Sequence, residues 1–178
     1  MTTAHVFIAT SLDGFIARRD DDIDWLTSYP TLGEDHGYDA HITRMDGVIM
    51  GRGTYEKVVT FDQWYYTKPT IVLSRTLDPH SVPDHLKDKI EILAATPEEV
   101  MAIAAQRGWT KIYVDGGQLI QAFLRAGLVE DMIITKVPIL LGTGIPLFGE
   151  TGRDIALEHL STKAFPSGMV QSHYSVKR

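Results

Sequence analysis

The sequence predicts a single α/β domain over residues 1–178, built on a mixed central sheet. Its 178 residues are enough for one domain and not comfortably enough for two. Short apolar runs alternate with segments of helical periodicity over the first two thirds of the chain, a pattern typical of parallel strands joined by helices. The last third contains strands separated by loops, which predicts an antiparallel edge beside a parallel centre.

The first strand is expected at residues 6–10, a β-branched and apolar run that ends in a turn at residues 11–14. Residues 18–22 are all charged, and this cluster favours a solvated loop over a metal site. A helix is expected at residues 34–45, because apolar side chains recur there at helical spacing. Acidic residues lie at its start, where the helix dipole favours negative charge.

Two further apolar strands are expected at residues 48–50 and 69–74, with a shorter one at residues 91–94. The strand at 48–50 runs into Gly51, and Thr54 is the expected N-cap of the helix that follows.

The next helix is expected at residues 97–107, where the initial proline suits the first helical turn. A strand at residues 111–115 then leads into a double glycine and a helix that closes at Gly127. Residues 132–137 form another strand, and the following loop at 142–146 precedes two alternating segments.

The composition excludes several classes of function. Seventeen basic and 23 acidic residues give a net charge of −6, which argues against a surface that coats nucleic acid. Without cysteine the chain has no disulfide, thiolate zinc site or iron–sulfur cluster, and His36 and His41 lie five residues apart, so no metal site is expected. No run of about 18 apolar residues and no basic leader occurs, so we expect a cytoplasmic protein that does not enter membranes.

Candidate ligand-binding residues follow three of the expected strands. Ligands of open α/β sheets bind at the carboxyl ends of the strands. Gly116 and Gly117 lie between a strand and a helix, where the missing side chains would let a phosphate approach free backbone amides. A double glycine can equally be a packing requirement, and taken alone it is weak evidence.

Arg52 and Arg75 each follow an apolar strand directly, which would place two guanidinium groups on one rim of the sheet. A guanidinium binds phosphate bidentately and keeps its charge, which suits the extra phosphate of NADP better than the bare ribose of NAD. The alternative is a pair of solvated surface arginines.

Four segments in order along the chain resemble the signature segments of the dihydrofolate reductase-like superfamily. They are residues 9–17 (ATSLDGFIA), 48–56 (VIMGRGTYE), 72–75 (VLSR) and 114–117 (VDGG). Residues 123–131 (FLRAGLVED) and 138–148 (PILLGTGIPLF) are similar to the reductase domain of riboflavin biosynthesis. The tyrosine that folate reductases carry a few residues after the double glycine is absent, since residues 118–121 are QLIQ. The resemblance implies a three-layer fold with helices on both faces of the sheet.

The resemblance also implies NADPH as the hydride donor and a small pterin- or pyrimidine-type heterocycle as the substrate. Arg52 and Arg75 would contact the adenosine phosphate, and Asp13-Gly14 would begin a loop over the nicotinamide. The positions that match the family's cofactor site are Ala9, Thr10, Gly51, Arg52, Thr54, Ser74, Arg75, Gly116, Gly117 and Leu119.

Superfamily members often carry a carboxylate on the helix before the strand at 48–50, where it can supply a proton when a hydride adds to a C=N or C=O bond. Asp35 is the choice by position, and Asp39, four residues on, can share its helix face. The alternative is that both acids only complement the helix N-terminus.

Aromatic side chains at Trp25, Trp64 and Tyr65 are expected near the mouth of the cleft, where they either stack on a planar heterocycle or pack into the core. The apolar segment 138–148 is expected to form the surface of a homodimer. The competing functions are a nucleotide-binding module without efficient turnover, such as a sensor or sequestering protein, and a fold retained only for assembly.

Overall fold

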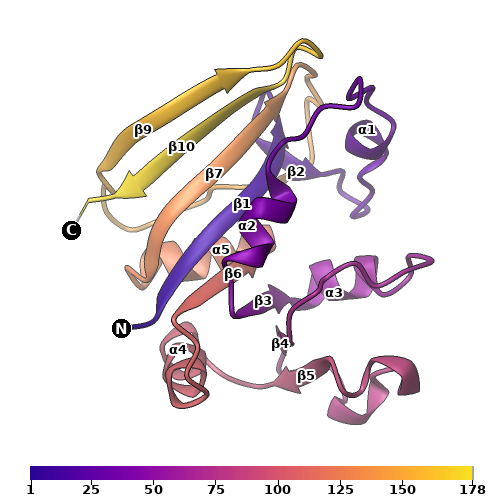
Figure 1. Ribbon diagram of the computed structural model, residues 1–178, viewed down its shortest axis with the longest axis vertical. Helices are drawn as coiled ribbons and strands as arrows, with labels where there is room; N and C mark the ends of the chain where they lie inside the picture. Colours follow the sequence, from indigo (N-terminus) through magenta and orange to yellow (C-terminus); the bar gives the residue numbers. More distant parts are fainter. Residues whose placement is uncertain (178) are drawn as a thin grey trace.

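The computed structural model describes residues 1–177, and its strands form one large mixed sheet (Figure 1). The strand order is β5-β4-β3-β6-β1-β7-β10-β9, parallel from β5 to β7 and antiparallel from β7 to β9. The strands are β1 (Thr3–Ser11), β3 (Gly47–Gly51), β4 (Thr70–Leu73), β5 (Ile90–Leu93), β6 (Lys111–Asp115), β7 (Val129–Val137), β9 (Leu157–Ala164) and β10 (Val170–Val176). The expected parallel centre and antiparallel edge are confirmed.

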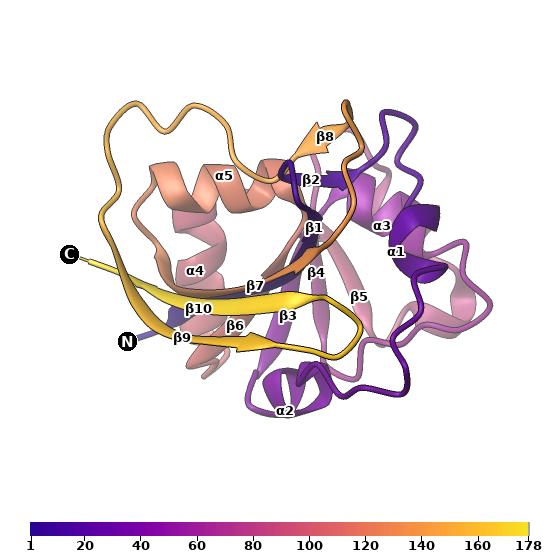
Figure 2. The ribbon, with the colours of Figure 1, turned by 90° about the horizontal axis from the view of Figure 1, so that it is seen from above.

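Helices cover both faces of this sheet, which confirms the three-layer arrangement (Figure 2). On one face α4 (Pro97–Gln106) and α5 (Gly117–Arg125) pack on alternate side chains of β1 and β6. On the other face α2 (Tyr38–Thr43) and α3 (Arg52–Val58) enclose a second core with β3 and β4. Because side chains of a strand alternate between faces, each central strand contributes to both cores.

Local sequence explains why α4 and α5 form where they do. Thr96 caps α4, accepting a hydrogen bond from the Glu99 amide, while the Glu99 carboxylate accepts one from the Thr96 amide. Helix α5 directs Phe123 and its apolar neighbours into the sheet, and Phe123 is fully buried. The chain leaves α5 through Gly127, whose positive φ of 68° suits glycine.

Two expected helix boundaries need correction. The helix expected at 34–45 is only α2, because Gly37 takes a left-handed conformation with φ of 85° and begins the helix there. Glu34 is held outside the helix by hydrogen bonds from the amide and hydroxyl of Ser167 (2.7 and 2.6 Å). Thr54 does not cap α3, which begins at Arg52 after the extended residue Gly51.

A small second sheet and three short helices complete the described elements. The sheet pairs β2 (Phe15–Ala17) with β8 (Ile145–Pro146). The short helices are α1 (Asp24–Thr27) and two 3-10 turns at Pro79–Ser81 and Asp84–Leu86. Within residues 1–177 no helix has the length and apolar character needed to cross a membrane.

Segment 138–148, the expected dimer surface, is largely used within the monomer. Leu147 is buried in the core on the α5 side, and Ile139 and Leu141 pack against the cluster around Trp25. Leu140 and Phe148 remain exposed. The segment is therefore mainly a structural element of this chain.

Candidate active site

A cleft of about 990 Å³ lies at the carboxyl ends of β1, β3, β4 and β6. Its size is at the upper end of the ~300–1,000 Å³ typical of ligand and cofactor pockets. The parallel central strands all end at this edge, so the residues that follow them meet there. Nine of the ten expected cofactor residues line the cleft: Ala9, Gly51, Arg52, Thr54, Ser74, Arg75, Gly116, Gly117 and Leu119.

The double glycine lies where side chains would not fit. Gly116 has φ of 106°, and a Cβ there would lie 2.6 Å from the Thr54 hydroxyl oxygen. A Cβ on Gly117 would lie 2.7 Å from Cδ1 of Ile16, a residue of β2. The backbone at the start of α5 therefore comes unusually close to both α3 and the small sheet. Packing alone accounts for these glycines, which are buried and also line the cleft.

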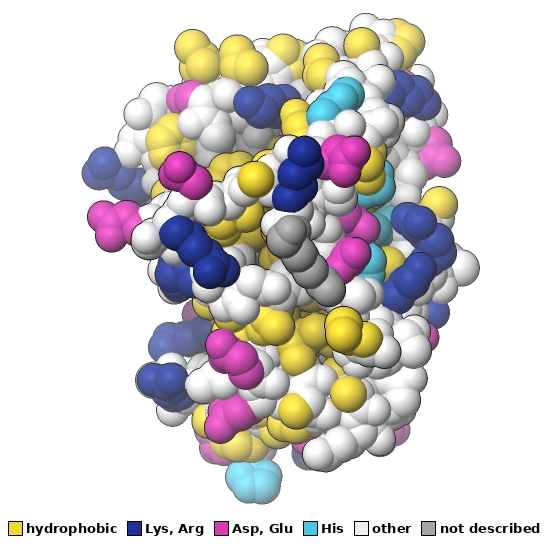
Figure 3. Space-filling view, turned by 90° about the vertical axis from the view of Figure 1, so that its left-hand side faces the viewer, with side chains coloured by type: hydrophobic (Ala, Val, Ile, Leu, Met, Phe, Trp, Pro, Cys, Tyr) yellow, Lys and Arg dark blue, Asp and Glu magenta, His cyan; other side chains and the backbone are white. Residues whose placement is uncertain are grey.

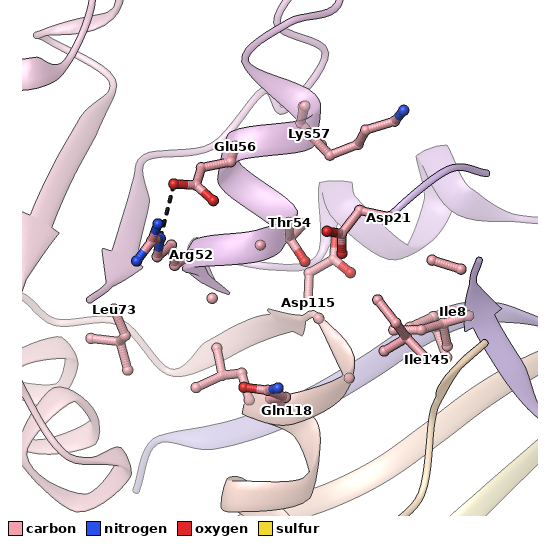
Figure 4. Close-up of a pocket in the computed structure, with 18 of the residues that line it drawn as sticks. Ile8, Asp21, Arg52, Thr54, Glu56, Lys57, Leu73, Asp115, Gln118 and Ile145 are labelled. Atoms are coloured by element: carbon pink, nitrogen blue, oxygen red, sulfur yellow. Dashed lines mark hydrogen bonds and ion pairs between the residues drawn. The ribbon is translucent and has the colours of Figure 1, made fainter. Parts of the chain in front are cut away.

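Arg52 and Arg75 both line the cleft, but only Arg52 has hydrogen-bond partners among residues 1–177. The Arg52 guanidinium donates to the Glu56 carboxylate (2.9 Å) and to the Thr76 hydroxyl (2.8 Å), as Figure 4 shows for Glu56. Arg75 is exposed and forms no hydrogen bond or ion pair within the described residues. Ser74 shapes the turn beneath them, because its hydroxyl accepts hydrogen bonds from the amides of Thr76 and Leu77.

Three of the expected site residues do not line the cleft. Thr10 is buried, and its hydroxyl has no hydrogen-bond partner within residues 1–177. Asp35 is exposed and accepts a hydrogen bond from the Gly37 amide (2.7 Å), and Asp39 is exposed on α2. Helix α2 begins only at Tyr38. The Tyr38 side chain therefore lines the cleft, and the carboxylates of Asp35 and Asp39 do not.

Asp115 is a titratable residue at the floor of the cleft, and it was not among the site residues expected from the sequence. It is the last residue of β6 and lies beneath α3 (Figure 4). Burial raises the pKa of the Asp115 carboxyl, and the hydrogen bond that Oδ2 accepts from the Tyr66 hydroxyl (2.5 Å) offsets only part of that rise. A carboxyl with a raised pKa in a cleft is a candidate proton donor.

The sequence contains a signal for Asp115. Residues of a strand that are two apart share one face, so Asp115 lies on the same face as Tyr113, opposite Val114. An acid placed at the carboxyl end of a buried parallel strand, directly before a double glycine, lies where ligands of such sheets bind. The family resemblance assigns segment 114–117 to the cofactor and gives Asp115 no role of its own.

Six aromatic side chains form a continuous lining of the cleft, which we call the aromatic wall. Its rings follow one another at centroid distances of 5.8, 6.3, 6.4, 4.7 and 6.1 Å in the order Phe7, Tyr38, Tyr113, Tyr66, Tyr65 and Phe61. Of the aromatics expected near the mouth, only Tyr65 lines the cleft. Trp25 is buried in a separate cluster, and Trp64 packs behind Tyr66.

The charged loop at residues 18–22 also reaches the cleft. Asp21 lines it near the start of α3, where its carboxylate lies 3.8 Å from the position of a Cβ on Gly53. Lys57 pairs with Asp22 (3.6 Å), and its ammonium group points away from Asp115 (Figure 4). The loop is exposed, as expected, but it also contributes negative charge to the cleft.

The fold and cleft define a dihydrofolate reductase-like α/β domain, and the comparisons identify its family. The family model of the RibD C-terminal domain matches residues 3–171, so the chain belongs to that family. It is 35% identical over 173 residues to Uncharacterized protein YwjB of Bacillus subtilis (strain 168), covering 95% of each chain.

Solved structures agree with this assignment. The crystal structure of "Putative riboflavin biosynthesis protein" from Shewanella sp. PV-4 matches with a TM-score of 0.92 and 39% identity, over 99% of this chain and 100% of that one. A diaminohydroxyphosphoribosylaminopyrimidine deaminase/5-amino-6-(5-phosphoribosylamino)uracil reductase from Thermotoga maritima matches with a TM-score of 0.68 and 14% identity. This chain covers 57% of that longer protein, and the likeness establishes the fold alone.

Proposed function

We propose that the protein is an NADPH-dependent reductase that delivers a hydride to a planar pterin- or pyrimidine-type heterocycle. The observation that carries this proposal is the convergence of Arg52, Arg75, the double glycine and Asp115 on one cleft, although they follow three different strands. Membership of the RibD C-terminal domain family supports the same activity.

The residues of the cleft fit a dinucleotide that carries an extra phosphate. The exposed Arg75 guanidinium is free to bind a phosphate at the end of β4, two strands from β6. Gly116 and Gly117 line the cleft at the start of α5, a helix of nine residues, and their backbone would contact the diphosphate there. Leu119 would pack against the cofactor below Gly51.

NADPH, when bound, supplies the hydride, and a side chain of the protein must supply the proton that the reduction also requires. Asp115 is the candidate to transfer this proton, because burial raises the pKa of its carboxyl and the Tyr66 hydroxyl orients the group. The aromatic wall lies beside Asp115 and would orient a planar substrate while excluding water from it. Proton transfer from Asp115 to the nitrogen of a C=N bond would neutralise the charge that hydride addition leaves there.

The test measures NADPH oxidation with a panel of pterins, flavin precursors and quinonoid compounds, alongside thermal unfolding with and without NADPH. We expect NADPH at 100 times its Kd to stabilise the protein by about 2.7 kcal/mol. Turnover of one panel member should fall at least tenfold in Asp115→Asn while NADPH affinity is kept. NADPH binding without turnover of any compound would favour a binding module, and absence of both would refute the proposal.

We also propose a homodimer, formed through the sheet edge and not through segment 138–148. Strand β9 is the outer strand of the sheet, and each of its eight residues is exposed, including Leu157 and Leu160. Exposed long edges are usually covered in native proteins. Figure 3 shows this side of the molecule, where apolar and charged side chains are mixed. Light scattering should give twice the chain mass, and Leu160→Lys should give the monomer; a monomeric wild type would refute this.

A further inference from the structure

The cationic side chains of the cleft are unevenly placed. Among the described lining residues they are Arg52, Lys57 and Arg75. Arg75 follows β4, which lies two strands from β6 and three from β1, or about 10 to 14 Å across the sheet. Arg52 is neutralised by Glu56, and Lys57 is paired with Asp22. The part of the cleft around Asp115 therefore receives little positive charge.

The part that remains for the substrate is aromatic and acidic. The aromatic wall surrounds Asp115: Tyr66 donates a hydrogen bond to its carboxylate, and Tyr113 precedes it by two residues on the same face. The Tyr38 hydroxyl is buried beside the cleft and has no hydrogen-bond partner within residues 1–177. Tyr66 is buried beneath Tyr65, whereas Tyr65 is 46% exposed and is the ring that a planar partner can reach.

These features discriminate between ligand chemistries. A phosphate dianion placed against the aromatic wall would lose its hydration without gaining a cation and would lie beside the Asp115 carboxyl. A planar ring with an amino or amidine group would instead donate hydrogen bonds to Asp115, and any positive charge would be stabilised by the surrounding ring faces. A neutral dioxo ring offers Asp115 only a single ring N–H donor flanked by carbonyl oxygens, which the carboxylate disfavours.

We propose that the substrate part of the cleft, the aromatic wall with Asp115, selects a phosphate-free planar heterocycle that carries an amino or amidine group. This rests on the proposed function and narrows it, since it excludes substrates that carry a phosphoribosyl group. Asp115 and the tyrosines are the specificity-determining residues, and the arginines at the other end of the cleft serve only the cofactor.

The experiment uses two matched pairs of probes on the NADP⁺-saturated protein, with binding measured by calorimetry or ligand fluorescence. The first pair is 2,4-diamino-6,7-dimethylpteridine and its dioxo analogue 6,7-dimethyllumazine. The second is 2-aminopurine riboside and its 5′-monophosphate. We expect the diamino compound to bind at least tenfold more tightly than the dioxo compound, and the riboside at least tenfold more tightly than its phosphate.

Asp115→Asn should reduce the preference for the diamino compound to about threefold or less, whereas Asp88→Asn, the same change at an exposed acid outside the cleft, should leave it unchanged. The wild-type ratios carry the test even where Asp115→Asn does not fold. Tighter binding of the dioxo compound or of the phosphate, or no binding of any probe, would overturn the inference. Failure of NADP⁺ itself to bind would overturn the proposed function instead.

Discussion

Replacing Arg75 by alanine should weaken binding of NADPH and leave binding of NADH nearly unchanged. Arg75 lies at the end of β4, lines the cleft and has no ion-pair partner within the described residues. The Arg75 guanidinium would therefore bind a phosphate at this rim without breaking a hydrogen bond or ion pair to any of residues 1–177. NADH lacks that phosphate and gains nothing from the side chain.

The expected magnitude follows from the exposure of Arg75. A hydrogen bond to a charged group contributes about 1.5 to 3 kcal/mol, and a solvent-exposed pair lies near the lower end of that range. About 1.5 to 2 kcal/mol corresponds to a 10- to 30-fold increase in the Kd of NADPH. Arg52→Ala should cost less than tenfold, because Glu56 and Thr76 already occupy the Arg52 guanidinium.

The assay titrates each variant with NADPH and NADH and follows nucleotide fluorescence. Arg44→Ala serves as the matched control, because Arg44 is exposed at the end of α2 and does not line the cleft. The NADPH preference of the wild type should also fall as the salt concentration rises, since exposed charges are screened. Equal losses for the two nucleotides in Arg75→Ala would show that Arg75 does not bind the adenosine phosphate.

Three further predictions concern stability and the glycine turn. Gly116→Ala should lower the free energy of unfolding by about 1 to 3 kcal/mol, because its φ is 106° and the new Cβ meets the Thr54 hydroxyl. The affinity for NADPH should fall as well. Unchanged values in urea unfolding and NADPH titration would contradict the tight turn. Phe123→Ala should cost about 3 to 5 kcal/mol in urea unfolding, because Phe123 is fully buried, and a loss under about 1 kcal/mol would be inconsistent with that packing. Burial lowers the pKa of His41 to about 4, so the unfolded chain takes up a proton first as pH falls below 6.5, and stability should decrease between pH 6.5 and 4 by up to about 1.4 kcal/mol per pH unit. His41→Leu should remove that part of the pH dependence, and an unchanged slope would show that another group causes it.

Short stretches of sequence were sufficient to predict the elements that depend on interactions between residues close together in the chain. The proline at the start of α4, the apolar face of α5 and the strands that end at Gly51 and Asp115 all follow from short stretches of sequence. The helix expected at 34–45 starts later in the structure, because Gly37 begins α2 in a left-handed conformation and Ser167, 133 positions from Glu34, holds that glutamate outside the helix. No window around Glu34 contains that contact.

The residues at the cofactor end of the cleft could be predicted from the sequence, because the carboxyl ends of parallel strands meet at one edge of a sheet. The residues at the substrate end could not be predicted in this way. Phe61, Tyr65 and Tyr66 lie in a loop without periodicity, and only its path over β6 brings the Tyr66 hydroxyl to Asp115, 49 residues away. Alternation and spacing in the sequence place Asp115 on one face of β6 but do not show which side chains surround it.

The periodicity of the sequence thus determined the α/β class with its mixed sheet and the strand-end residues that converge, since both depend on the geometry of parallel strands, and the family resemblance implied the helices on both faces. Only the tertiary structure decided which carboxyl lines the cleft, Asp115 and neither Asp35 nor Asp39, and which of the two arginines has no partner among residues 1–177. Those outcomes depend on contacts between distant segments, where burial and pairing set the charge and reach of each side chain.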